Sequence, residues 1–330
     1  MSTKDLVMSL IKLDGPSGME DGVAEYLREV LGGGKLTRLG SLVYEMKGNG
    51  KGKIGVFAHM DEIGMVVSSE VGDGFFYVER LGGVDPKILP SSKVKVFTRK
   101  GVLRGVIGII APHLTPPEER GKVQGFDDLV LDLSMSDWES VRPGDRVVLD
   151  VEPCESGNLV CGKALDNRAG CAVLVKVRDY LRKMKHGHDV YLVFSTQEEV
   201  GGPGARSVAY ELDLDYAIVV DVTFAEKVPG HDLVKINEGP AIAVGPFVDR
   251  ELFNLAMDVA KRHGVKSQVE ALPMRTGTDT DAIRMTKVGV KTLLVSIPLL
   301  HMHTPVEVVS VDDIENAARL ISHIIVELEG

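Results

Sequence analysis

The chain has two segments in which predicted helices and strands alternate, as in α/β proteins. A long segment without any helical pattern separates them. Before residue 69, helices are predicted up to Leu13 and over 21–31, and strands over 42–48 and 53–59. From 69 to 161, short strands alternate with Gly- and Pro-rich turns, as in a small all-β barrel or sandwich. We therefore predict one α/β domain made of residues 1–68 and 162–330, interrupted by a β module over residues 69–161.

The second α/β stretch supplies most of the predicted sheet. Helices are expected near 166–184, 204–211, 249–263, 279–286 and 312–328, and strands at YLVFST, YAIVVDV, AIAVG, SQVEALP and KTLLVSIP. Open α/β sheets bind ligands beyond the carboxyl ends of their strands. The residues that follow these strands are therefore the first candidates for a functional site.

Side chains that bind metals gather at those strand ends. His59 ends KIGVFAH, a glutamate pair follows YLVFST, Asp221 follows AIVV, and His303 lies five residues past TLLVSIP. Each residue alone has an ordinary explanation, such as a helix N-cap or a solvated face, but their coincidence at one edge favours a metal site. The set extends from residue 59 to residue 303, which excludes a local zinc finger. The complete candidate set is His59, Asp61, Asp166, Glu198, Glu199, Asp221 and His303.

The residue types suggest distinct roles within this set. Glu198 and Glu199 are expected to point in opposite directions along an extended chain, so that one binds metal and the other faces substrate and water. Asp61 is placed to accept the imidazole N–H of His59. No thiolate is present, which suits Zn²⁺, Co²⁺ or Mn²⁺ in a catalytic site. Two such ions would activate water and polarise a carbonyl, while a free glutamate moved the proton.

Charge and cysteine content limit the possible partners and compartment. Acidic residues outnumber basic ones by 48 to 38, for a net charge of -10, and no basic run offsets them. Binding to nucleic acid or to an anionic membrane is therefore not expected. Three cysteines form no metal or disulfide pattern and are expected to be buried in a reducing compartment. With no signal peptide and no apolar run long enough to span a bilayer, a cytoplasmic location is expected.

Six motifs, in this order, resemble those of the TET-type (tetrahedral) dinuclear metalloaminopeptidases, which are related to glutamyl and deblocking aminopeptidases. The motifs are AHMDEIG, ALDNRAG, TQEEVGGPGAR, DVT, the GTD of RTGTDTDAI, and HTPVE. The resemblance covers nearly the whole chain. It implies a phosphorylase/hydrolase-like α/β catalytic domain with an inserted barrel-like dimerisation domain, and six dimers assembled into a hollow dodecamer.

The resemblance also implies a role for each candidate residue. His303 and Glu199 would bind one ion, His59 and Asp221 would bind the other, and Asp166 would bridge them. Glu198 would be the general base, and Asp61 would steer His59. The implied cofactors are two divalent ions per subunit, most readily zinc or cobalt with manganese as a third choice, and the implied substrates are peptides.

Two segments depart from the family pattern. Arg275, Thr276 and Asp281 stand where the family commonly has small residues, and Leu300–His301 replaces an Arg-Tyr pair. The simpler interpretation is that these side chains point away or pair with each other. The sharper hypothesis is that Arg275 or Asp281 selects the charge of the N-terminal side chain of the substrate.

The leading function is removal of N-terminal residues from peptides, and three alternatives remain open. A deacylase or carboxypeptidase-like hydrolase of small amides would use the same ligands. An endoglucanase would need two carboxylates without metals, and sugar grooves use aromatic platforms, whereas aromatics make up only 5% of this chain, with Trp138 the single tryptophan. A non-catalytic assembly protein would be expected to have lost a ligand, and none is lost.

Overall fold

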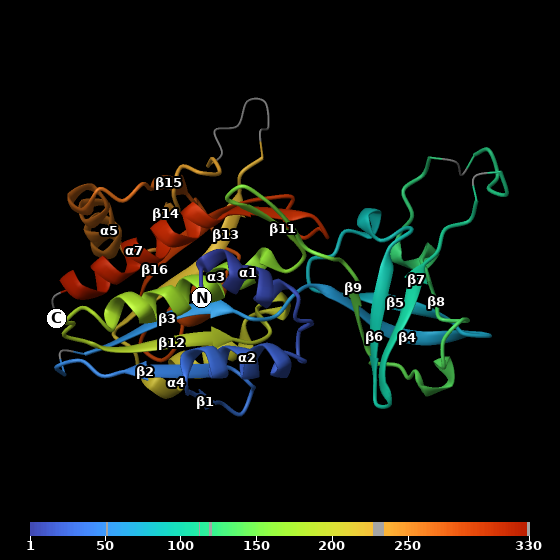
Figure 1. The fold of residues 1–330 in the computed structure, drawn as a ribbon, viewed down its shortest axis with the longest axis horizontal. Helices are drawn as coiled ribbons and strands as arrows, with labels where there is room; N and C mark the ends of the chain where they lie inside the picture. Colours follow the sequence, from blue (N-terminus) through green and yellow to red (C-terminus); the bar gives the residue numbers. More distant parts are fainter. Residues whose placement is uncertain (51, 112, 119–120, 227–233, 329–330) are drawn as a thin grey trace.

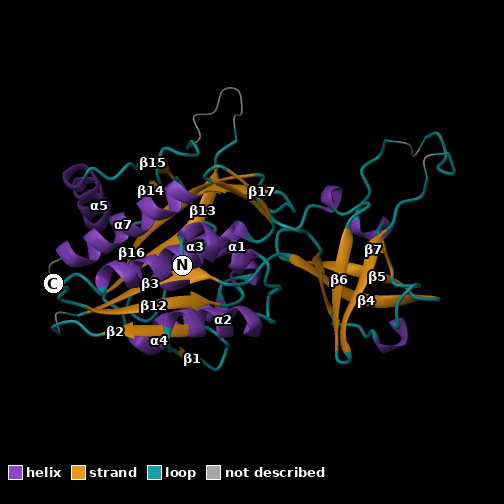
Figure 2. Cartoon of the chain, in the orientation of Figure 1, coloured by secondary structure: helices purple, strands orange, loops and turns teal. Residues whose placement is uncertain are grey.

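The computed structural model describes residues 1–50, 52–111, 113–118, 121–226 and 234–328. An α/β body carries both ends of the chain, and an antiparallel barrel lies beside it, joined by extended segments (Figure 1). Figure 2 shows that the helices longer than one turn belong to the body, while strands make up most of the barrel. The predicted α/β fold with an inserted β-barrel is confirmed.

The body is built on a large mixed sheet whose central strands are parallel. The sheet order is β1-β2-β12-β3-β13-β16-β17-β11-β10, with β14 paired to β16 and β15 paired to β14. Strands β12, β3, β13 and β16 run parallel and are buried over most of their length, as expected for strands covered on both faces. The strands are β1 (Lys35–Leu36), β2 (Leu42–Met46), β3 (Lys53–His59), β10 (Cys154–Ser156), β11 (Leu159–Gly162), β12 (Asp189–Ser195), β13 (Tyr216–Phe224), β14 (Ala241–Val244), β15 (Gln268–Ala271), β16 (Lys291–Leu300) and β17 (Glu307–Ser310).

Helices bury the apolar faces of this sheet. Helix α3 packs against β3 and β13 and is flanked by α1 and α7, whereas α4 and α6 pack on each other and on β3. Because α3 begins at Leu165, one residue before the bridging candidate Asp166, this packing holds Asp166 in the first turn of the element, near the ends of the central strands. The helices are α1 (Thr3–Ile11), α2 (Asp21–Leu31), α3 (Leu165–Leu181), α4 (Pro203–Leu212), α5 (Arg250–His263), α6 (Asp279–Arg284) and α7 (Val311–Glu327).

The barrel closes in the order β4-β5-β8-β7-β6-β9 and encloses a hydrophobic core of its own. Alternate residues such as Met65, Val67, Phe76 and Val78 point into that core, which is the two-residue period of a half-buried strand. Its strands are β4 (Gly64–Gly72), β5 (Phe75–Leu81), β6 (Lys93–Thr98), β7 (Gly101–Ile107), β8 (Val130–Asp132) and β9 (Arg146–Leu149).

The barrel strands occupy a range that differs from the predicted module of residues 69–161. Strand β4 begins at Gly64, and both it and the three-residue β8 were absent from the predicted strands. Beyond Leu149 the chain returns to the body, where β11 pairs with β17 of the large sheet. The short strands β10 and β11 resembled those of the barrel in sequence, but Val160 belongs to the core of the body.

A chain of charged side chains fixes the barrel against the body. Lys95 of β6 lies 3.0 Å from Asp14, which follows α1. The same aspartate lies 3.1 Å from Lys163, and the ammonium group of Lys163 lies 2.5 Å from Glu62, beside the candidate Asp61. The junction between the two parts therefore leads directly to the strand end that carries His59.

Cysteine exposure differs from the expectation. Cys171 is buried and Cys161 is half-buried, but Cys154 is exposed because β10 is an edge strand of the sheet. Within the described ranges, no helix combines the length and apolar character that crossing a bilayer requires.

Candidate two-metal site

Strand register brings two candidate residues, His59 and Asp221, level at one edge of the sheet. Ser195, at the end of β12, pairs with His59 at the end of β3. In the neighbouring pair, Val219 of β13 is level with Phe57 of β3, so Asp221 comes level with His59 two residues later. His303 follows the end of β16 by three residues, closer than the five predicted, because β16 extends to Leu300.

The five predicted ligands form two groups that share Asp166. One group contains His59, Asp166 and Asp221, and the other contains Asp166, Glu199 and His303; within each group one donor atom per residue lies within 4.8 Å of the others. His59 Nε2 lies 3.0 Å from Asp166 Oδ1 and 3.9 Å from Asp221 Oδ1. His303 Nε2 lies 3.1 Å from Asp166 Oδ2 and 3.2 Å from Glu199 Oε1.

Asp166 turns one carboxylate oxygen toward each histidine. Burial would raise the pKa of Asp166, but the imidazoles of His303 and His59 hold it well below its usual value. Burial would likewise lower the pKa of His303, yet Asp166 and Glu199 raise it to about 11. The pKa of His59 is raised well above its ordinary value against its burial, chiefly by Asp166 and Asp61. Each group of donors thus attracts positive charge.

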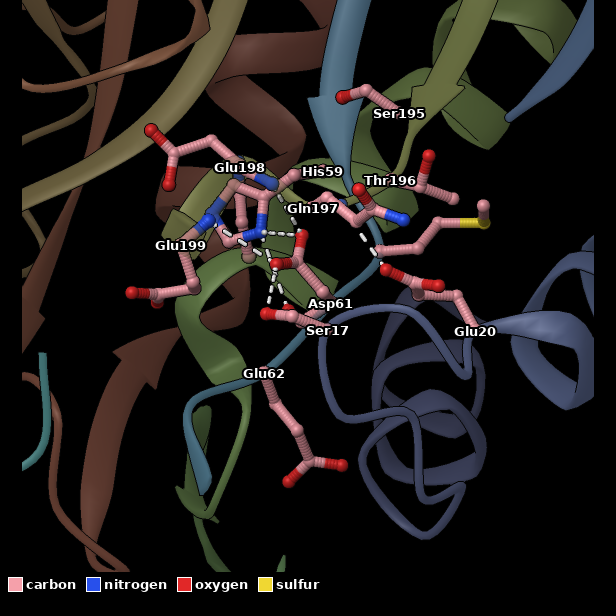
Figure 3. A network of polar contacts seen from close by, with 12 residues as sticks. Ser17, Glu20, His59, Asp61, Glu62, Ser195, Thr196, Gln197, Glu198 and Glu199 are labelled. Carbon is pink, nitrogen blue, oxygen red and sulfur yellow. Dashed lines mark hydrogen bonds and ion pairs between the residues drawn. The ribbon is translucent and has the colours of Figure 1, made fainter. Parts of the chain in front are cut away.

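Asp61 organises three parts of the site at once. Its carboxylate accepts hydrogen bonds from the Ser17 hydroxyl at 2.7 Å and from the backbone N–H groups of Glu198 and Glu199 at 3.0 and 3.1 Å. Its Oδ1 also lies 3.3 Å from His59 Nδ1, the ring nitrogen that faces away from Asp166. Figure 3 shows this carboxylate among these groups, while the side chain of neighbouring Glu62 points away.

The two glutamates lie in a tight turn and not in the extended chain that the sequence suggested. Residues Glu198–Val200 form one 3-10 turn, preceded by Gln197 at φ 62°. The prediction of an extended pair was wrong because Asp61 accepts both backbone N–H groups, which draws the chain into a turn. A donor atom of each glutamate nevertheless lies within 4.8 Å of His59 and of the other glutamate.

The site contains more carboxylates than imidazoles, and an excess of buried negative charge favours the binding of metal ions. Burial raises the pKa of Glu198 to about 10, with further contributions from Asp221, Asp279 and Glu199. Burial also raises the pKa of Asp221 well above its usual value. Buried carboxylates that repel one another are stabilised by bound cations. Imidazole and carboxylate donors without thiolates are the set that a borderline or hard divalent ion takes, so the residues fit two such ions.

Glu307 is a site residue that the sequence analysis missed. Its carboxylate accepts the backbone N–H of His303 at 2.8 Å and that of Asp166 at 3.2 Å. It therefore holds the backbone of two residues of the second donor group. Burial and the neighbouring Asp166 raise its pKa well above the usual value. The available signal was a glutamate directly before two valines at the start of β17; in the structure it is 2 % exposed.

Asp279 is a second missed residue, although its GTD motif was recognised. It begins α6, is 1 % exposed, and accepts a hydrogen bond from Ser195 at 2.5 Å, next to His59 in the sheet. Burial raises its pKa to about 7, and its other oxygen lacks a hydrogen-bond partner in the described structure. It adds to the negative charge around Glu198.

The segment with unusual residues is partly closed on itself. Asp281 accepts the backbone N–H of Thr276 at 3.0 Å and that of Gly277 at 3.1 Å, and also the Thr276 hydroxyl. These hydrogen bonds agree with the simpler of the two interpretations, in which Asp281 pairs within its own segment. Arg275 is exposed, and the backbone N–H of exposed His301 donates to Glu226 at 2.5 Å.

The family comparison and the comparison with individual proteins both match aminopeptidases. The model of the M42 glutamyl aminopeptidase family matches residues 40–320. A lysyl aminopeptidase of Pyrococcus furiosus is 32% identical over 340 residues, which cover 98% of this chain and 97% of that protein.

Solved structures agree with the family match. An aminopeptidase of Desulfurococcus kamchatkensis superposes with a TM-score of 0.91 at 35% identity, covering 99% of this chain and 95% of the other. The TET1 peptidase of Pyrococcus horikoshii, which can assemble into a tetrahedron or a large octahedral shell, gives 0.87 at 29%, covering 99% and 100%. A Thermotoga maritima protein described as an endoglucanase gives 0.77 at 29%, covering 97% and 96%.

Proposed function

Since this chain belongs to the M42 glutamyl aminopeptidase family and is an aminopeptidase, we propose that it cleaves N-terminal residues with two divalent ions bridged by Asp166. The observation that carries this proposal is the placement of Asp166 Oδ1 3.0 Å from His59 and Oδ2 3.1 Å from His303. A carboxylate that divides its oxygens between two groups of donors is suited to bridge paired ions.

Each remaining ligand would complete one side of the bridge. Asp221 would join His59, and Glu199 would join His303. When bound, zinc, cobalt or manganese would lower the pKa of a water and polarise the scissile carbonyl. Asp61 would keep His59 in the tautomer that presents Nε2, because a carboxylate at Nδ1 favours the proton there.

Proton transfer would fall to Glu198. Its carboxylate lies in a group with His59 and Glu199 but is not needed by either group that shares Asp166. Burial is the main cause of its raised pKa, and the neighbouring carboxylates add to it. Bound cations would oppose that repulsion, so that Glu198 could accept a proton from water and deliver it to the leaving amine. The acidic surroundings would also attract the free α-ammonium group that marks an N-terminus.

The proposed metal dependence is tested with a panel of chromogenic substrates. Protein stripped with a chelator should be inactive on leucyl, lysyl and glutamyl anilides, and Zn²⁺, Co²⁺ or Mn²⁺ should restore turnover at two ions per chain. N-acetylated versions of the same anilides serve as the control and should remain intact, because they lack the α-ammonium group. Release of acetate from the acetylated forms would favour a deacylase, and turnover of cellulose would favour an endoglucanase; either result in place of anilide cleavage contradicts the proposal.

We also propose that the barrel forms the contact between the two subunits of a dimer, and that six dimers build a dodecamer. Several large apolar residues are exposed on the barrel and the segment beyond β7, and an apolar patch of this kind is typical of an interface. They include Val102, Val106, Ile109, Ile110 and Val123, with Ile110 66% exposed. The assemblies of the Pyrococcus horikoshii relative support a large particle.

Light scattering tests the proposed assembly. With 35.7 kDa per chain, we expect the mass of twelve subunits for the wild-type protein and that of a monomer for the variant Ile110→Lys. A wild-type mass of one or two chains would contradict the dodecamer.

We also propose a cytoplasmic location, because cysteines that remain free fit a reducing compartment.

A further inference from the structure

A carboxylate outside the predicted ligand set, that of Glu270, is held by two residues that neighbour Asp221 in the sheet. Glu270 of β15 accepts hydrogen bonds from the hydroxyls of Thr223 and Ser296. Thr223 follows Asp221 by two residues in β13, and Ser296 of β16 is the direct strand partner of Asp221. The alternation of side chains along a strand places all three on the same face of the sheet. Glu270 is therefore held over the face that presents a metal ligand.

The distance from the metal site suits the side chain of a bound N-terminal residue. Two residues of strand separate Thr223 from Asp221, which corresponds to about 7 Å. The four-carbon stem of a lysine side chain spans a similar length. A substrate whose α-amine and scissile carbonyl lie at the ions could therefore place a long side chain against Glu270.

The charge of Glu270 is not balanced by a neighbouring cation. Its hydrogen-bond donors are neutral hydroxyls, and no ion pair within 4.0 Å reaches it from any residue that the structure describes. The side chain is half-buried, so water screens its charge less than at an exposed position. A half-buried carboxylate held by neutral donors is stabilised by an incoming cation.

We propose that Glu270 selects substrates with a cationic N-terminal side chain, lysine or arginine, by pairing with its ammonium or guanidinium group. This inference rests on the proposed aminopeptidase function. Thr223 and Ser296 act as positioning residues that hold the carboxylate in place. Asp281, the other acidic candidate, already accepts three hydrogen bonds within its own loop.

The test compares kcat/KM on lysyl, leucyl and glutamyl anilides for metal-loaded wild type and Glu270→Gln. The wild type should prefer the lysyl substrate. The variant should lose about 10- to 100-fold of the lysyl-to-leucyl ratio, the scale of one charged hydrogen bond, with leucyl turnover nearly unchanged. Asp281→Asn is the matched control and should keep the wild-type ratio.

A measurement on the wild type alone guards against misfolding of the variant. Norleucine has the stem of lysine without its charge, so lysyl should be cleaved at least about 10-fold better than norleucyl anilide. An unchanged lysyl-to-leucyl ratio in an active Glu270→Gln, or a wild type that prefers norleucyl or glutamyl substrates, overturns the inference. Wild type that cleaves no aminoacyl anilide contradicts the proposed function instead.

Discussion

Glu198→Gln is expected to lower kcat about 10³-fold while both metal ions stay bound. Glutamine preserves the shape of the side chain but cannot accept the proton of the attacking water, and positioned general bases contribute about 10²–10⁴-fold. The backbone N–H of Glu198 would still donate to Asp61, so the 3-10 turn should remain. The measurements are single-turnover rates on leucyl anilide and metal content by elemental analysis.

Glu199→Gln provides the contrast to this variant. Glu199 lies 3.2 Å from His303 within the second donor group, so its substitution should lower metal content toward one ion per chain as well as activity. The two neighbours would thus be distinguished by metal content, because both variants lose turnover. If Glu198→Gln lost an ion and Glu199→Gln kept both, the two roles would have to be exchanged.

Asp166→Asn is expected to abolish metal binding at both positions and to lower kcat/KM by at least about 10³-fold. Asp166 is the one residue common to both donor groups, and it contacts both histidines. Metal ions contribute several kcal/mol of transition-state stabilisation, and about 4 kcal/mol corresponds to about 10³-fold in rate. Metal titration of stripped protein measures the stoichiometry, which should fall from two ions to none.

Asp313→Asn is the matched control for the loss of a buried aspartate. Asp313 of α7 is fully buried and accepts the backbone N–H groups of Asn237 and Gly239, but it belongs to neither donor group. Added metal should raise the Tm of wild type and of this control, because a ligand that binds only the folded state stabilises it. The same shift in Asp166→Asn would show that Asp166 is not required for binding.

The elements, and the place of the candidate ligands in the fold, could be predicted from the sequence where one local pattern decided them. Helix α2 occupies the predicted range because apolar residues recur on one face and glycine follows at 32. His59 and Asp221 could be placed at one edge because each follows an apolar run, and parallel strands end together. The short strands β8 and β17 carry too few residues for a period to be recognised.

Features that depend on contacts between distant segments could not be predicted. Glu307 holds the backbone of Asp166, 141 residues away in sequence, and no local pattern indicates such a contact. The 3-10 turn at Glu198 likewise depends on Asp61, 137 residues away. Glu270 reaches Thr223 because β14 and β15 fold back onto the sheet, and neither strand alone indicates where its side chains point.

The order of the two donor groups along the chain has a consequence for biosynthesis. Residues 59, 166 and 221 make up one group, whereas the other group is incomplete until His303 has been added. At about 5–20 residues per second, on the order of 10–50 s pass between the synthesis of His59 and that of His303. Under the proposed roles, a nascent chain would hold at most one of its two ions before His303 is added. The proposed two-metal mechanism would therefore leave the chain inactive until translation has passed His303.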